Sequence, residues 1–260
     1  MVGRESPLNL TKLEKLSDLN ETTFADIPIA MRLAFLKRML RVTALSDKSD
    51  LDLRFDLFER LNTGGVALSP QEVRSCVYKG KLSDELKSLT ADPDFSGLLK
   101  LQEKRQADGT REEQVLKFFA YLETRNEFKG AVKKFLNDYS KSISSAKDFS
   151  ARASTFKKAV QALGAVIDGP FLRPGLYITP LNQFEAVLVA SAEELEVSEV
   201  PFNPQPGWLV DEELVRSSTG ATNTKTMLEA RISRARALLR GADVKPSRDV
   251  PNEDEVESEL

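Results

Sequence analysis

Histidine is absent from the 260 residues of this sequence. The absence excludes Ser-His-Asp and Cys-His catalytic arrangements, metal sites built on imidazole ligands, and nucleases of the HNH type. Cysteine is nearly absent too, because Cys76 is the only one. One thiol forms no disulfide within the chain and holds no zinc or iron–sulfur centre, and it is typical of a reducing compartment. We expect Cys76, which falls within a predicted helix, to be buried and inert.

Long apolar runs are missing as well, since none reaches the roughly 18 to 20 residues of a membrane-spanning helix. The first residues, Met-Val-Gly-Arg-Glu-Ser-Pro, lack the apolar stretch of a signal peptide. We therefore expect a soluble, cytoplasmic protein without a membrane partner.

Neither sign of charge dominates, because 37 Lys and Arg residues stand against 40 Asp and Glu residues, for a formal net charge of −3. Five of the acids lie close to the C-terminus: Glu253, Asp254, Glu255, Glu257 and Glu259. The rest of the chain is therefore slightly basic. This balance is compatible with nucleic-acid binding but does not require it.

The hydrophobic residues recur with the 3.6-residue period of a helix almost throughout the chain. We therefore predict an all-α fold, a single multi-helix domain with at most one or two short strands. The expected helices lie near residues 26–40, 51–61, 69–79, 83–90, 95–101, 111–125, 129–139, 145–167, 181–194, 209–215 and 224–240. We expect a flexible N-terminus over 1–12, the helical domain over 13–240, and an acidic, disordered tail over 241–260.

One segment, residues 41–45, has the alternation of a strand, with Val42 and Ala44 on one side. No second strand is evident to pair with it. An unpaired strand presents free N–H and C=O groups, so we expect this segment to form an exposed edge or part of a partner interface.

The densest local pattern runs from Phe58 to Arg74. Its structural interpretation is a helix–turn–helix: Asn62, Gly64 and Gly65 end one helix, and Ser69, Pro70 and Glu72 begin the next with a capping box. Its functional interpretation is an anion-binding loop, with free backbone N–H groups near a helix N-terminus and Arg60 and Arg74 close by. Spacing alone favours the structural interpretation.

The same run closely resembles a signature of the GmrSD-type family, the ParB/sulfiredoxin-like proteins of type IV restriction and phage defence. That signature reads Phe-x-Arg-Leu-Asn-Thr-Gly-Gly, a short gap, then Leu-Ser/Asn-x-Gln-Glu-hydrophobic-Arg, and each position is matched here. Further similarity covers residues 13 to 240, and it is weaker at the ends. It includes Leu16, Leu19, Asn20, Phe24, Asp26, Pro28, Phe184–Val187, Thr222–Thr224 and Arg231–Ile232.

The resemblance implies a site but no catalytic centre. Relatives carry a small α/β domain with an Asp-Gly-Gln-Gln-Arg motif, which this sequence does not contain. We therefore expect no catalytic residue, no metal and no cofactor in this chain, with a nucleotide bound together with the partner domain. The implied nucleotide- or phosphate-binding residues are Arg60, Asn62, Thr63, Gly64, Gly65 and Arg74. The expected role is nucleotide or DNA binding and assembly in an anti-phage restriction system.

The implied partner is a ParB-like domain or protein, a second copy of this chain, or DNA. The alternative is a stand-alone helical interaction or regulatory protein that docks on a full-length relative. On either view this chain alone is not expected to be an enzyme, although the family would imply a nuclease or NTPase.

The last helix offers a separate candidate for nucleic-acid contact: Lys225, Arg231, Arg234 and Arg236. A Ser/Thr/Gly-rich stretch precedes it, and its N–H groups would suit a phosphate. The structural alternative, which we favour, is an exposed basic helix whose cations suit its C-terminal dipole. The Lys133–Lys134 and Lys157–Lys158 pairs are interpreted as solvated faces.

Overall fold

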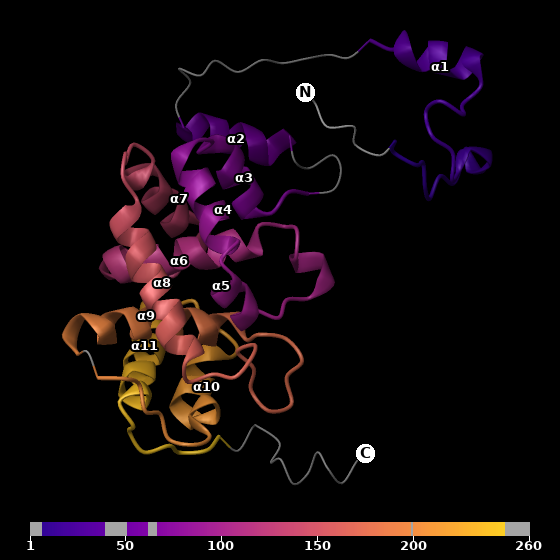
Figure 1. Cartoon of the computed structure of the whole chain (residues 1–260). Helices are drawn as coiled ribbons and strands as arrows, with labels where there is room; N and C mark the ends of the chain where they lie inside the picture. The colour runs from indigo at the N-terminus through magenta and orange to yellow at the C-terminus, as the bar shows by residue number, and fades with distance from the viewer. Residues whose placement is uncertain (1–6, 40–50, 62–66, 199, 248–260) are drawn as a thin grey trace, which may run out of the picture. The chain divides into compact units, whose positions relative to one another are not determined.

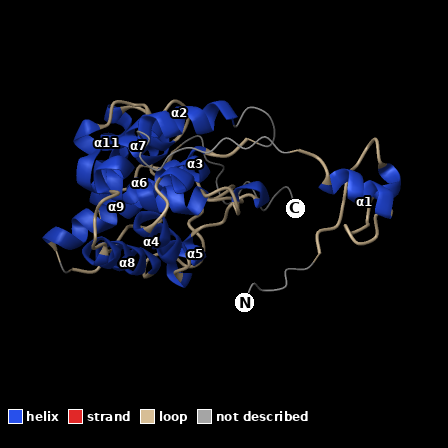
Figure 2. Ribbon diagram, turned by 90° about the horizontal axis from the view of Figure 1, so that it is seen from above, coloured by secondary structure: helices blue, strands red, loops and turns tan. Residues whose placement is uncertain are grey.

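The computed structural model describes residues 7–39, 51–61, 67–198 and 200–247. Over these ranges it contains eleven α-helices and no strand, and its extended pairings are two isolated bridges, Asn9–Thr23 and Asp211–Pro246. The all-α class predicted from the hydrophobic spacing is therefore confirmed (Figure 2). The expected strand at 41–45 lies outside the described residues.

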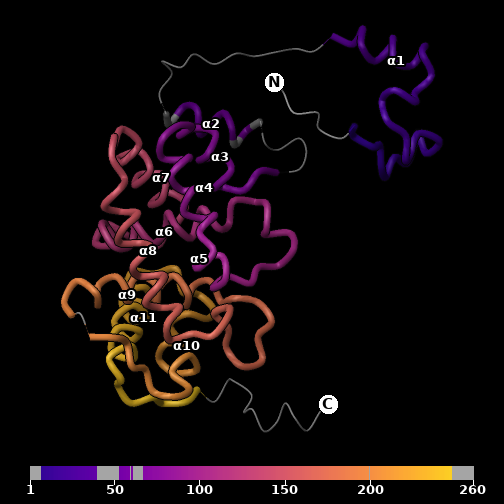
Figure 3. The backbone as a smooth tube through the Cα atoms, in the orientation of Figure 1, coloured from indigo at the N-terminus to yellow at the C-terminus, as the bar shows by residue number. Residues whose placement is uncertain are grey.

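The path of the chain through the helices is traced in Figure 3. They are α1 (Ile29–Leu36), α2 (Leu51–Leu61), α3 (Pro70–Val77), α4 (Lys81–Thr90), α5 (Pro93–Leu98), α6 (Thr110–Thr124), α7 (Val132–Ile143), α8 (Ser150–Gly164), α9 (Leu181–Val197), α10 (Glu212–Ser218) and α11 (Lys225–Leu239). Short 3₁₀ turns lie at Ser17–Leu19, Glu103–Arg105, Arg125–Glu127 and Trp208–Val210.

The chain divides into two units, Met1–Ser49 and Asp50–Leu260. In the first unit α1 has no buried residue, and the leucine spacing before it yields only the 3₁₀ turn Ser17–Leu19. The hydrophobic core belongs to the second unit and begins at Phe55. The helical domain expected over 13–240 therefore has its core in the second unit alone.

The centre of the second unit is α9, which packs against α6, α8, α10 and α11. Its sequence is apolar on nearly all sides, and residues from Gln183 to Ala192 are buried without a break. A helix that is hydrophobic all round is one that other helices surround. In Figure 1, α9, α10 and α11 lie together at one end of this unit, and α2, α3 and α7 at the other.

Aromatic side chains fill the space between these two ends. Phe156 of α8 makes an edge contact with Phe118 of α6 at 5.2 Å and with Phe95 of α5 at 5.1 Å between ring centroids. Edge-to-face pairs of this kind stabilise a core beyond the area they bury. Trp208 is buried and packs edge-on against Phe171, which anchors the 3₁₀ turn Trp208–Val210 on the core.

Local capping explains where several helices begin. Ser69 accepts a hydrogen bond from the Glu72 N–H, and the Glu72 carboxylate accepts one from the Ser69 N–H, which completes the predicted capping box before α3. Asp92 caps α5 without a reciprocal bond, because its carboxylate accepts from the N–H groups of Asp94 and Phe95. Asp211 and Thr224 cap α10 and α11.

The packed chain continues beyond residue 240, where we expected the acidic tail to begin. The Glu212 N–H donates to the Lys245 carbonyl at 2.7 Å, and the Ser247 N–H donates to the Val210 carbonyl at 2.8 Å. Val244 packs against the core. Residues 241–247 are ordered by these contacts, while the acidic residues from 253 onward lie outside the described residues.

Candidate functional site

The signature found in the sequence occupies α2, α3 and the loop between them. The two helices pack against each other. Asn62, Thr63, Gly64 and Gly65 lie outside the described residues. Arg60 and Arg74 flank that loop and are described.

Arg60 lies in the last turn of α2 with its side chain exposed. Its guanidinium pairs with Asp56, one turn earlier, at 3.0 Å. A cation in this position also suits the C-terminal dipole of the helix. Arg60 is therefore at the surface, next to the signature loop, as a phosphate ligand would need to be.

Arg74 lies instead inside the protein, with 2% of the residue exposed. Its guanidinium donates to Gln71 Oε1 at 2.8 Å, to Asn137 Oδ1 at 3.2 Å and to Glu113 Oε2 at 2.5 Å. Burial lowers the pKa of Arg74, and the Glu113 carboxylate opposes that shift. With these partners, the Arg74 side chain cannot contact a ligand directly in this conformation. Its effect on the surface is to position Asn137.

Arg74 is one end of a buried row of alternating charges. Glu113 also lies 3.6 Å from Lys117, and Lys117 lies 3.1 Å from Glu185. Glu185 pairs with Arg231 at 2.8 Å. Burial disfavours the charged form of Lys117, but the Glu185 and Glu113 carboxylates outweigh it and raise the pKa of Lys117. The row joins α3, α6, α9 and α11.

Arg231 forms the other end of the row, with an exposed fraction of 0%. Its guanidinium also donates to the Thr222 carbonyl at 2.9 Å. We expected a possible nucleic-acid contact at this residue, but the buried side chain offers no surface to a nucleic acid. The sequence pattern did not distinguish it from its exposed neighbours, because the carboxylate that binds it is 46 residues away.

The other cations of α11 are at or near the surface and have acidic or carbonyl partners. Arg234 donates to both carboxylate oxygens of Asp211, at 2.9 and 2.7 Å. Arg236 lies 3.3 Å from Glu193, and Lys225 donates to the Asn126 carbonyl at 2.9 Å. The acidic partners of the two arginines reduce the positive potential that a phosphate would meet along this helix.

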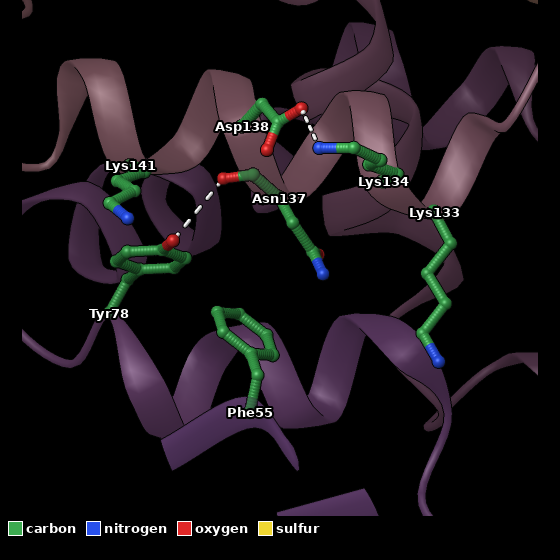
Figure 4. A pocket seen from close by; sticks show the side chains of 7 residues that line it. All are labelled: Phe55, Tyr78, Lys133, Lys134, Asn137, Asp138 and Lys141. Carbon is green, nitrogen blue, oxygen red and sulfur yellow. Dashed lines mark hydrogen bonds and ion pairs between the residues drawn. The ribbon is translucent and has the colours of Figure 1, made fainter. Parts of the chain in front are cut away.

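A pocket that the sequence analysis missed lies between α2, α3 and α7 (Figure 4). Its volume is about 260 Å³. Its apolar side is formed by Phe55 and Tyr78, whose ring centroids are 5.5 Å apart. Its polar side comes from α7: Lys133, Lys134, Asn137, Asp138 and Lys141. We call it the lysine pocket.

Among the described residues that line the lysine pocket, three are lysines and one is an acid. Lys134 donates to Asp138 at 2.8 Å. Lys133 and Lys141, which also have interaction partners, lie at opposite sides of the pocket. We interpreted Lys133 and Lys134 as a solvated face. The spacing of Lys134, Asn137 and Lys141 places them on one face of α7. It does not indicate that this face packs against α2 and α3, because that contact joins segments far apart in the sequence.

Two hydrogen bonds to Asn137 hold the lysine pocket to α3 and its C-terminal end, and one of them comes from the signature. Arg74, the last signature residue, donates to the Asn137 side chain, and Tyr78 Oη donates to the Asn137 carbonyl at 3.2 Å. The helix that carries the lysines is therefore positioned by α3. A cationic lining beside aromatic rings suits a phosphate and its attached nucleotide unit.

Two further features limit the chemistry of the described residues. They hold no group of three or more His, Cys, Asp or Glu side chains that could bind a metal ion. Over the same ranges, every helix is too short or too polar to cross a membrane.

Cys76 of α3 is exposed, which corrects our expectation of a buried thiol. It falls on the solvent side of α3, between the buried residues Val73 and Val77.

Comparison with known proteins adds no relative to this picture. No protein-family model, no curated protein and no solved structure matches the chain.

Proposed function

We propose that this chain is the phosphate-binding and assembly part of a GmrSD-like anti-phage restriction system, and that it acts with a ParB-like catalytic domain. The signature from Phe58 to Arg74 and the wider similarity over 13–240 support the family. The observation that carries the binding role is the hydrogen bond from Arg74 of the signature to Asn137 at the lysine pocket.

In this proposal two backbone phosphates of DNA lie against Lys133 and Lys141, one at each side of the pocket. The pocket, at about 260 Å³, is smaller than most enclosed small-molecule sites and is open to solvent, which favours one unit of a polymer over a whole free ligand. Phe55 and Tyr78 provide an apolar surface for the sugar or base of that unit. The resemblance also implies phosphate contacts from Arg60 and from residues 62–65, and the latter lie outside the described residues.

Catalysis is assigned to the partner domain. The resemblance places the Asp-Gly-Gln-Gln-Arg motif in that domain, and this sequence does not contain it. A nucleotide held by the ParB-like domain is the cofactor that the resemblance implies. The role of this chain is to hold the DNA and to bring it to that domain.

The binding role is tested with fluorescence anisotropy of a labelled DNA duplex and the full chain. We expect the double variant Lys133→Gln/Lys141→Gln to bind the duplex at least tenfold more weakly than the wild type. The matched control is Lys157→Gln/Lys158→Gln, which removes two exposed charges from α8. Thermal melting of both variants establishes that each is folded.

The control should bind like the wild type. If both double variants lose affinity equally, the effect is general electrostatics and the lysine pocket is not the site. If the wild-type chain does not bind the duplex at low salt, the DNA-binding proposal is wrong.

A second candidate function is that of a helical interaction protein that docks on a full-length relative. The first unit favours it, because Ile29, Phe35 and Leu36 of α1 are each about two-thirds exposed within that unit. Several large apolar side chains on one short helix are typical of a protein interface.

Co-sedimentation of the chain with a ParB-like family member separates the two functions. Docking through α1 predicts that Phe35→Asp/Leu36→Asp abolishes the complex, while Lys133→Gln/Lys141→Gln leaves it intact. The opposite pattern would assign the partner contact to the lysine pocket. Sedimentation of the chain alone detects self-association through the same helix.

A further inference from the structure

The connection between α8 and α9, residues 168–180, contains an arginine without a partner among the described residues. Arg173 is half-buried, and its Nε and Nη1 atoms are buried without a hydrogen-bond acceptor there. Burial lowers the pKa of Arg173, and no described carboxylate opposes that shift. This guanidinium has lost part of its hydration without gaining an anion, which is unfavourable for folding.

The guanidinium keeps one open edge. Nη2 is not among its buried nitrogens, so an acceptor that approaches from solvent meets this edge. The positive charge of a guanidinium is delocalised over its three nitrogens. An anion at Nη2 therefore compensates the whole cation, including the part carried by Nε and Nη1. Arg173 is thus suited to an anion from outside the described residues.

A tight turn holds Arg173 in a defined position. The Leu176 N–H donates to the Arg173 carbonyl at 3.0 Å. Between them lie Pro174 and Gly175, and the φ of Gly175 is 75°, as a type II turn requires. Tyr177 follows the turn and is 81% exposed. An exposed tyrosine close to an arginine on a rigid loop is typical of the residues that dominate a binding surface.

A second segment, residues 98–105, lies against this loop and makes its surroundings cationic. The Phe171 N–H donates to the Leu98 carbonyl, and the Thr179 N–H donates to the Lys100 carbonyl, both at 2.9 Å. Over the two segments four cations stand against two acids: Lys100, Lys104, Arg105 and Arg173 against Glu103 and Asp168. This excess favours a ligand with several negative charges.

The C-terminal end of the same chain is such a polyanion. Residues 249–260, which we call the acidic end, contain no Lys or Arg and six acids: Asp249, Glu253, Asp254, Glu255, Glu257 and Glu259. They lie outside the described residues. Their charge is opposite to that of the surface around Arg173.

The described chain ends close to that surface. The Ser247 N–H donates to the Val210 carbonyl at 2.8 Å. Val210 belongs to the same 3₁₀ turn as Trp208, whose ring centroid lies 6.4 Å from that of Phe171. Phe171 is two residues before Arg173. Twelve residues extend up to about 40 Å, and a tether of this reach gives the acids a high local concentration at the loop.

We propose that the loop 168–180 is a docking surface for the acidic end, with Arg173 as its central contact. One carboxylate of the acidic end accepts from Arg173 Nη2, and further acids lie near the cations of residues 98–105. Tyr177 and Ile178 contact the apolar side chains between the acids. The contact supplies the anion that Arg173 lacks. It does not depend on the DNA contact proposed at the lysine pocket.

The test uses a fluorescein-labelled peptide of residues 249–260 and the full chain at low salt, with anisotropy as the readout. The receiving chain carries Asn or Gln at its own six acids, so that it does not compete; we call it the neutral-end chain. We expect saturable binding, weakened about fivefold or more by Arg173→Gln in that chain. Arg216→Gln, which removes an exposed cation of α10, should leave it unchanged.

Two comparisons show whether the acidic end occupies the loop in its own chain. The wild type, which keeps its acids, should bind the peptide about fivefold or more weakly than the neutral-end chain. Neutralising the acids should also lower the melting temperature by about 2 °C or more when Arg173 is present. The same neutralisation in an Arg173→Gln chain should have no effect, because the two changes remove one interaction.

Absence of peptide binding at low salt would overturn the proposal, and so would equal losses in Arg173→Gln and Arg216→Gln. Equal peptide affinity of the wild type and the neutral-end chain would exclude docking within one chain. Loss of peptide binding in Lys133→Gln/Lys141→Gln would place the acidic end at the lysine pocket instead. If Arg173→Gln weakens binding of a DNA duplex but not of the peptide, the loop is a DNA contact. Because duplex and peptide are measured separately, failure here is distinguishable from failure of the proposed DNA binding.

Discussion

Glu185 is the residue on which the buried row of charges depends. Its carboxylate is almost completely buried and binds Lys117 at 3.1 Å and Arg231 at 2.8 Å. A buried ion pair is weak evidence of net stabilisation, but removing one partner leaves an uncompensated charge in the core. Here a single neutralisation would take the carboxylate partner from Arg231 and leave Lys117 with Glu113 alone.

We therefore predict that Glu185→Gln lowers the free energy of unfolding by about 3 kcal/mol. The matched change Glu229→Gln, in an exposed pair with Lys225, should lower it by less than about 0.5 kcal/mol. Urea unfolding of both variants measures the difference. Equal effects would mean that the buried row contributes no more than a surface pair.

Asp211 provides a prediction on pH. Burial disfavours its carboxylate, but hydrogen bonds from Arg234 and from the N–H groups of Lys245 and Leu214 outweigh burial and hold the pKa of Asp211 below its usual value. A lowered folded-state pKa adds stability above the unfolded-state value and loses it as the pH falls through the folded-state value. The contribution is therefore complete at neutral pH and is lost in acid.

We expect the free energy of unfolding to fall as the pH drops below about 4. Asp211→Asn should flatten this acid limb. Thermal melts from pH 7 to pH 3 provide the measurement. An acid limb of the same slope in Asp211→Asn and the wild type would exclude Asp211 as a cause.

At the scale of the helices, glycines decide where two elements approach each other. Gly130, just before α7, has a φ of 93°, and a Cβ there would lie 2.8 Å from the Asn223 carbonyl oxygen. Gly97 lies within α5, and a Cβ there would meet nothing within 4 Å. The same substitution should therefore have opposite signs at the two positions.

Gly130→Ala should lower the free energy of unfolding by more than about 1 kcal/mol, because it forces an unfavourable φ and a backbone clash. Gly97→Ala should raise it by up to about 1 kcal/mol, because alanine loses less conformational freedom in a helix. Denaturant melts compare the two. Destabilisation by Gly97→Ala as large as that by Gly130→Ala would contradict this packing.

The helices also mark the reach of sequence-based prediction. The start of α3 was predicted to the residue, because Ser69, Pro70 and Glu72 act on neighbours three positions away. The helix expected near 26–40 is shorter than predicted, because α1 spans Ile29–Leu36, and before it only the 3₁₀ turn Ser17–Leu19 forms. That segment has no core to pack against, and packing supplies most helical stability in proteins.

Packing between distant segments also explains which parts of the candidate site the sequence did not predict. Arg74 and Arg231 were recognised as notable residues, but their burial depends on Glu113 and Glu185, which lie far away in sequence. The lysine pocket was missed because it forms only when α7 packs on α2 and α3. Local patterns identify the ends of helices, whereas pockets and buried charges depend on contacts between distant segments.

At the scale of the whole molecule, the buried row of charges connects the two ends of the second unit. Arg74 at one end fixes Asn137 beside the lysine pocket, and Arg231 at the other end fixes the loop before α11. Charged rows of this kind hold helices in one relative arrangement. The signature is thus tied to the core, and the lysine pocket is presented on a rigid support.

The most direct measurement of the DNA-binding role is the salt dependence of affinity for a DNA duplex. Each phosphate contact steepens the decline of log affinity with log salt by about 0.9. We predict a linear decline for the wild-type chain, and a slope shallower by about 1.8 for Lys133→Gln/Lys141→Gln, since two contacts are lost. Lys157→Gln/Lys158→Gln should follow the wild type. Parallel lines for the wild type and the lysine-pocket variant would contradict the account.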